Sequence, residues 1–132
     1  MRKHIWAAAG LLVILALILA ACGGAAGKSG AAGAVENYLK AVVSKDSAKV
    51  SALSCKTWES QALLEMDAFQ AVKAELEGVA CKENGADGSA TLVTCTGKIN
   101  TTYNSEVQSL DVSRQTYQVV QEGGDYRVCG EK

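Results

Sequence analysis

The residues with the most distinctive chemistry in this 132-residue chain are five cysteines. They are Cys22, Cys55, Cys81, Cys95 and Cys129. A thiol can react as a nucleophile, bind a metal ion or form a disulfide, and its surroundings decide which. The last four cysteines are separated by 26, 14 and 34 residues, so none forms a Cys-x-x-Cys pair. Zinc knuckles and dithiol redox sites use that pair, and the spacing therefore predicts neither a metal site nor a redox centre.

The only histidine, His4, lies in a segment with the character of a signal peptide. Arg2 and Lys3 form a basic start, and the 17 residues from Ile5 to Ala21 are uncharged and almost entirely apolar. Removal of residues 1–21 leaves a mature chain without histidine. This excludes Ser-His-Asp and Cys-His catalysis, and every histidine-containing metal site. We therefore expect no catalytic residues, no metal ligands and no cofactor.

The apolar run ends in Leu19-Ala20-Ala21-Cys22, which resembles the lipobox of bacterial lipoproteins. That motif consists of an aliphatic residue, two small residues, and a cysteine that carries lipid such as palmitate. The resemblance implies that Cys22 becomes the lipidated mature N-terminus. It also implies an extracytoplasmic protein of the bacterial cell envelope, anchored to the membrane through its acyl chains. The alternative is an uncleaved membrane anchor in which the cysteine is incidental.

The mature chain of 111 residues is long enough for one small domain. Of the chain's 13 basic and 14 acidic residues, Arg2 and Lys3 leave with the signal peptide, so 11 basic residues remain and the net charge is −3. No basic patch of the kind that binds nucleic acid remains. Residues 22–33 are predicted to be the lipidated cysteine and a flexible Gly/Ala linker, and residues 34–132 a single α+β domain. Gly27-Lys28-Ser29 lacks the preceding glycine of a phosphate-binding loop and belongs to the linker.

Helical patterns fill the first half of the predicted domain. Val35, Tyr38, Leu39 and Val42 follow the i, i+3, i+4, i+7 spacing of an amphipathic helix. Asp46 or Ser47 is the expected N-cap of a second, shorter helix. A third helix is predicted to carry an apolar stripe over five turns, made of Trp58, Ala62, Met66, Phe69, Val72 and Leu76. Charges are assigned to its opposite face, at Glu59, Glu65, Asp67 and Lys73.

Strand patterns begin at Gly78, where the apolar period changes to two. Turn clusters at 84–88, 103–106 and 122–125 separate the predicted strands. The alternation changes phase between Val112 and Tyr117, which requires either a bulge near residues 113–115 or two separate strands. The predicted fold is α+β: two or three N-terminal helices packed on a curved antiparallel four-stranded meander.

This layout resembles the nuclear-transport-factor-2-like (cystatin-like cone) superfamily. The matching features are the opening helix Ala34 to Ala41, the break Lys45-Asp46-Ser47-Ala48, and the final Tyr126-Arg127-Val128 strand after a Gly-Gly-Asp turn. The resemblance covers roughly residues 34–130. The superfamily contains isomerases, dehydratases, binding modules and assembly domains, so the fold alone does not imply one function.

Enzymes of this superfamily often place a His-Asp or Asp-Tyr pair in the cone. The mature chain has no histidine for the first kind of pair. Polar candidates on or near the strands are Glu106, Asp111 and Arg114.

The four cysteines after Cys22 are expected to form two disulfides, because the count is even and export leads to an oxidising compartment. Cys81 and Cys95 are equidistant from Gly88, so a hairpin centred there would place them opposite each other. This pairing leaves Cys55 with Cys129. The alternative, Cys55 with Cys81 and Cys95 with Cys129, remains open.

The favoured function is a non-catalytic envelope lipoprotein whose cone binds a small apolar ligand or an envelope protein partner. The candidate pocket residues are aromatic: Tyr38, Trp58, Phe69, Tyr103, Tyr117 and Tyr126. One alternative is an enzyme that uses a buried carboxylate with a tyrosine, which requires a carboxylate of perturbed pKa inside the cone. The other is a structural domain with a filled core, which would have no cavity.

Overall fold

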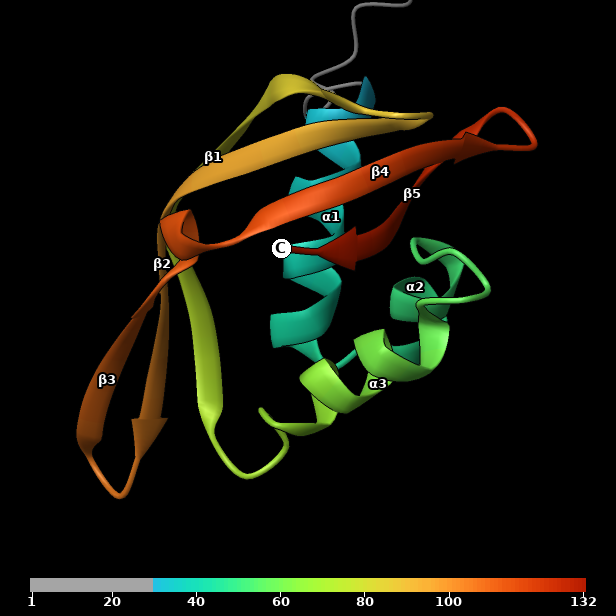
Figure 1. Cartoon of the computed structure of the whole chain (residues 1–132). Helices are drawn as coiled ribbons and strands as arrows, with labels where there is room; N and C mark the ends of the chain where they lie inside the picture. Colours follow the sequence, from blue (N-terminus) through green and yellow to red (C-terminus); the bar gives the residue numbers. More distant parts are fainter. Residues whose placement is uncertain (1–29) are drawn as a thin grey trace, which may run out of the picture.

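Three helices precede five strands in the part of the chain that the structure, a computed structural model, describes, namely residues 30–132 (Figure 1). The helices are α1 (Gly30–Ser44), α2 (Ser47–Ala52) and α3 (Glu59–Asp67). This order confirms an α+β fold. The predicted signal peptide, the lipobox and linker residues 23–29 lie outside the described residues. None of the helices within residues 30–132 has the length and apolar character needed to cross a membrane.

Helix α1 begins at Gly30, so the prediction of a flexible linker was wrong for residues 30–33. Ala31 is fully buried and Ala32 and Gly33 are also buried, because their small side chains let the helix lie close to the sheet. The helix ends at Ser44, and the next residue, Lys45, has a positive φ of 59°. The Lys45 and Asp46 N–H groups donate to the carbonyls of Val42 and Ala41, which is the Schellman arrangement that satisfies a helix C-terminus.

Helix α2 begins where the sequence predicts, and Asp46 is its N-cap. The Asp46 side chain accepts a hydrogen bond from the Lys49 N–H at 3.1 Å. Helix α3 ends at Asp67, so the prediction that it continues to Leu76 was wrong. The residues from Lys73 onward form a strand in which exposed and half-buried side chains alternate. Leu76 fits the helical spacing of the preceding stripe, but its partner is Ile99 of a neighbouring strand.

The strands are β1 (Lys73–Asp87), β2 (Ala90–Tyr103), β3 (Glu106–Asp111), β4 (Thr116–Glu122) and β5 (Asp125–Glu131). The phase change after Val112 is resolved as two strands, because the short 3-10 helix η1 (Val112–Arg114) separates β3 from β4. The sheet therefore has five strands and not the predicted four. It is also no simple meander, because β4 pairs with β2 and not with β3.

The sheet bends where β2 changes partner. Residues 91–94 of β2 pair with β4, and residues 98–103 pair with β3 on the same edge. Gly97 lies between these two segments, opposite a bulge at Gly78 and Val79 in β1. A Cβ atom at Gly97 would lie 2.7 Å from the Gly78 carbonyl, so only glycine fits this close approach. Figure 1 shows the result: β3 and the adjoining part of β2 turn away from the strands that cross α1.

The hydrophobic core lies between α1 and the inner face of the bent sheet. Val35, Tyr38 and Leu39 of α1 are at most 3% exposed. They belong to one cluster with Val93, Tyr117 and Val128 of the sheet. Helices α2 and α3 add Val50, Ala62 and Met66 to the same cluster. Burial of this apolar surface is the main stabilising contribution to the fold.

Two disulfides join the cysteines in the pairs that the sequence favours, Cys81 with Cys95 and Cys55 with Cys129. Cys81 and Cys95 are register partners in the β1–β2 hairpin. Cys55 reaches the last strand because Ser54 forms a parallel bridge with Val128. Two backbone hydrogen bonds of 2.8 Å hold this seam, from the Cys55 N–H to the Val128 carbonyl and from the Val128 N–H to the Leu53 carbonyl.

We predict that loss of the Cys55–Cys129 disulfide destabilises the domain more than loss of Cys81–Cys95. The first bridge closes a separation of 74 residues and the second one of 14. The loop-entropy relation gives about 4 and about 3 kcal/mol respectively. Urea denaturation of the two double cysteine-to-alanine variants, under oxidising conditions, measures both losses. A larger loss for the Cys81→Ala/Cys95→Ala variant, or a non-reducing peptide map that links Cys55 to Cys81, would contradict this prediction.

Candidate functional site

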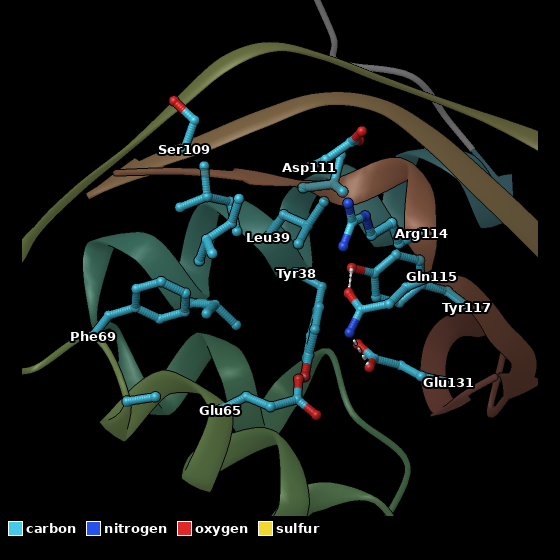
Figure 2. A pocket seen from close by; sticks show the side chains of 15 residues that line it. Tyr38, Leu39, Glu65, Phe69, Ser109, Asp111, Arg114, Gln115, Tyr117 and Glu131 are labelled. Carbon is cyan, nitrogen blue, oxygen red and sulfur yellow. Dashed lines mark hydrogen bonds between the residues drawn. The ribbon is translucent and has the colours of Figure 1, made fainter. Parts of the chain in front are cut away.

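A cavity of about 500 Å³ opens between α1, α3 and the bent sheet (Figure 2). This volume is within the usual range for small-molecule sites. One part of the wall is apolar and consists of Leu39, Val42, Ala68, Phe69, Ile99, Leu110 and Val112. The rest carries polar groups, from Tyr38, Glu65, Ser109, Asp111, Arg114, Gln115, Tyr117 and Glu131. Figure 2 shows Phe69 and Leu39 on one side of the open space and Gln115, Tyr117 and Glu131 on the other.

Tyr38 and Glu65 form the contact between α1 and α3 at the polar part of the wall. The Tyr38 hydroxyl donates a hydrogen bond of 2.6 Å to Oε2 of Glu65. The ring of Tyr38 is 1% exposed and meets the ring of Tyr117 edge-on, with 6.4 Å between the centroids. Because α1 is buried along this face, the hydroxyl has a fixed position from which it holds the carboxylate.

Gln115 links Tyr117 to Glu131 across the β4–β5 pair. Its side-chain oxygen accepts a hydrogen bond of 3.3 Å from the Tyr117 hydroxyl, and its Nε2 donates one of 2.9 Å to Oε2 of Glu131. Tyr117 and Glu131 are register partners. The backbones of Thr116 and Lys132 exchange two hydrogen bonds of 2.9 Å, which fix the strand ends that carry these groups.

Burial raises the pKa of both tyrosines well above the ordinary value. The charge of Glu65 acts in the same direction on both. The buried indole N–H of Trp58 forms no hydrogen bond with the described part of the chain, but it acts on Tyr38 in the opposite direction and lowers the pKa of the phenol. The two phenols therefore remain protonated at neutral pH and serve as hydrogen-bond donors, not as bases.

Among the carboxyl groups that line the cavity, Glu131 has a raised pKa. Burial, with a further contribution from the charge of Glu65, raises the pKa of Glu131 to about 7. At the rim the effect is opposite, because hydrogen bonds from Ser113 lower the pKa of Asp111. The cavity thus has an acidic inner group that exchanges its proton near neutral pH and an outer carboxylate that stays charged.

One cluster of metal-ligating residue types occurs within residues 30–132, formed by Cys55, Glu122 and Cys129. The two sulfur atoms of this cluster are bonded to each other in a disulfide. They therefore offer no thiolate, and a single carboxylate is left to bind a metal ion.

The structure brings three of the six predicted pocket residues to the cavity: Tyr38, Phe69 and Tyr117. Trp58 is half-buried and packs against the core without lining the cavity. Tyr103 and Tyr126 are 59% and 38% exposed and lie outside it. Tyr103 lies on β2 and Tyr126 on β5, as strand residues, but both side chains are exposed to solvent.

Polar residues account for the remaining differences between the prediction and the site. Asp111 and Arg114 line the cavity, whereas Glu106 does not. Glu65 was assigned to the solvent face of α3, which is wrong, since it lies seven residues after Trp58 and so on the same side of the helix. A charged residue on the apolar side of a helix indicates a functional position, so Glu65 could have been identified from the sequence. Gln115 and Glu131 were missed, and no local pattern marks either of them.

No model of a known protein family matches the chain, and no curated protein matches its sequence. Solved structures with a similar fold include a SEC-C motif-containing protein from Rhodopseudomonas palustris. It has a TM-score of 0.50 and 10% identity, over 76% of this chain and 75% of that one. The helical cell-shape-determining protein Pgp2 from Campylobacter jejuni matches with a TM-score of 0.50 and 8% identity, over 76% of this chain and 38% of Pgp2. At these identities the likeness concerns the fold alone.

We predict that Glu131→Gln removes a loss of stability that the wild type shows between pH 5 and pH 8. Folded Glu131 keeps its proton up to about pH 7, while an unfolded glutamate releases it near 4.5. The folded state is therefore favoured at low pH, and stability falls as pH rises through 7. Full linkage would be roughly 3 kcal/mol, and partial exposure lowers the expected loss to about 1–2 kcal/mol.

Urea denaturation at pH 5 and pH 8 checks this, with Glu122→Gln as the control, because Glu122 is exposed on the same sheet. The same loss of stability in wild type and Glu131→Gln would show that another group is responsible.

Proposed function

We propose that the chain is a lipid-anchored, extracytoplasmic lipoprotein of the bacterial cell envelope whose folded domain binds a small ligand without catalysing a reaction. The observation that carries the binding function is the cavity of about 500 Å³ with its apolar wall and polar groups. A filled structural domain would have no such space between α1 and the sheet. An envelope protein partner is the other occupant that the sequence suggests, but a concave site of this size suits a small molecule better.

The compartment is supported by two independent features. Leu19-Ala20-Ala21-Cys22 has the residue types of a lipobox and follows a basic, then apolar, segment. The two disulfides indicate an oxidising, extracytoplasmic environment. Acyl chains on Cys22 would anchor the domain to the membrane.

We also propose that the domain belongs with the nuclear-transport-factor-2-like folds. Three N-terminal helices lie against a bent antiparallel sheet, and the sheet encloses a cavity with α1 and α3. The similarity to Pgp2 adds that an arrangement of this kind occurs in a bacterial protein that determines cell shape.

The second candidate function is an enzyme that uses a carboxylate with a tyrosine. Glu131 favours it, because a half-buried carboxylate with a pKa of about 7 is suited to general acid–base catalysis. The phenols do not strengthen the case, since their raised pKa keeps them neutral. Binding is the better supported function, because it requires only that the phenols and Glu131 hold fixed positions as hydrogen-bond partners. Catalysis would require in addition that one of them transfers a proton to or from a substrate.

We predict that Cys22→Ser abolishes lipid attachment when the full chain is expressed in a bacterium. A hydroxyl cannot replace the thiol that accepts the diacylglyceryl group, so the lipid mass should disappear and processing after Ala21 should stop. Mass spectrometry of the N-terminal peptide measures both, and Ser29→Ala is the matched control in the linker. A lipid mass on the Cys22→Ser protein would refute the anchor.

We predict that Ala68→Phe displaces the bound ligand. Ala68 lines the cavity at the end of α3, and a phenyl ring there would fill part of the space. Ala52→Phe is the control, because Ala52 is an exposed alanine at the end of α2 that does not line the cavity. Native mass spectrometry of the full chain, purified from its membrane, should detect a retained molecule on the wild type and Ala52→Phe proteins only. Absence of any retained molecule from the wild type would contradict the binding function.

A further inference from the structure

The charges inside the cavity are unequally distributed. Its lining has three acidic residues and one basic residue, and no lysine. The basic residue, Arg114, and the acidic residue Asp111 are both exposed and lie at the two ends of η1. The positive charge of Arg114 contributes to lowering the pKa of Asp111. Figure 2 shows these two side chains together at one end of the site. The charge of Arg114 is thus close to a carboxylate of its own, and Glu65 and Glu131 are left as the remaining acidic pair.

Glu65 and Glu131 are held by neutral groups. Glu65 accepts from the Tyr38 phenol, and Glu131 accepts from the Gln115 amide. Neither of them takes part in a salt bridge within residues 30–132. Each hydrogen bond uses Oε2, so the second oxygen of each carboxylate has capacity to accept another donor. Above about pH 7, where Glu131 has released its proton, the two half-buried carboxylates repel each other, and a positive charge from outside would relieve that repulsion.

The opposite part of the wall is suited to a hydrocarbon group. Leu39, Val42, Phe69 and Ile99 line this part and have hydrocarbon side chains. A molecule that fits both parts therefore needs an apolar body and a cationic head.

We propose that the ligand is an amphipathic amine, whose protonated amino group lies beside Glu65 and Glu131 and whose apolar body lies along Phe69 and Leu39. This inference rests on the proposed binding function and names its ligand class. An ammonium group has several N–H donors and no acceptor, which matches the unoccupied carboxylate oxygens. An anionic ligand would add a third negative charge to the same space, and a neutral ligand would leave the repulsion between the two carboxylates unrelieved.

Three probes with the same six-carbon chain test the head group: hexylamine, 1-hexanol and hexanoate. Each is titrated at pH 8 into the full lipidated chain in nanodiscs of neutral phosphatidylcholine, with empty nanodiscs as the blank, and calorimetry measures the dissociation constants. Hexylamine is expected to bind about tenfold more tightly than 1-hexanol, and hexanoate more weakly than both. Equal affinities for the three probes would overturn the proposal.

Variants identify the carboxylates that are responsible. Glu65→Gln and Glu131→Gln should each weaken hexylamine binding about five- to tenfold and leave 1-hexanol binding unchanged. Glu122→Gln, an exposed position outside the cavity, should change neither. Full hexylamine affinity in both cavity variants would overturn the amine assignment. A retained molecule in native mass spectrometry combined with no preference for hexylamine would reject this inference alone, whereas a wild type that neither retains a molecule nor binds any probe would also reject the binding function.

Discussion

The burial of α1 inside the bend of the sheet is the constraint on which the rest of the structure depends. The helix can approach closely because its first turn consists of glycine and alanine, and the sheet can turn around it because β2 has glycine at residue 97. The cavity lies where this wrapping is incomplete. Its position is therefore a consequence of how far the sheet bends and of where α3 stops.

The polar part of the site combines residues from distant parts of the chain. Tyr38 comes from the first helix, Glu65 from the third and Glu131 from the last strand. The seam at Ser54 and Val128 brings the helical half against β5, and the adjacent disulfide covalently joins the same segments. Without this seam, nothing in the local structure of α3 or β5 would place the two carboxylates near each other.

Local patterns in the sequence account for much of the fold. The spacing of Val35, Tyr38, Leu39 and Val42 predicts α1, Asp46 predicts the start of α2, and the symmetry of Cys81 and Cys95 about Gly88 predicts the first hairpin. Where patterns of different period overlap, the prediction fails. Val72 and Leu76 continue a helical stripe, but Leu76 also continues a period-two alternation, and its pairing with Ile99 determines which one forms.

The candidate site was less predictable because polar residues were assigned by charge and not by position. Glu65 lies on the inner side of α3, and its partner there is the Tyr38 hydroxyl. Glu131 reaches the cavity through a register shift between Gln118 and Val119, which no local pattern announces. Exposed Tyr103 shows the reverse error, since an aromatic side chain on a strand does not have to face inward.

The wide spacing of the Cys55–Cys129 pair also determines the order in which the thiols become available. Of the four cysteines that follow Cys22, a chain that emerges from its N-terminus presents Cys55 first, then Cys81 and Cys95, and Cys129 only three residues before the last residue of this sequence. Cys55 therefore meets two incorrect partners before the correct one. The β1–β2 hairpin forms from neighbouring residues and can withdraw Cys81 and Cys95 from this competition early, since local contacts form faster than distant ones. Rapid closure of that hairpin protects the later pairing, so its disulfide contributes to the fidelity of oxidative folding as well as to the stability of the finished domain.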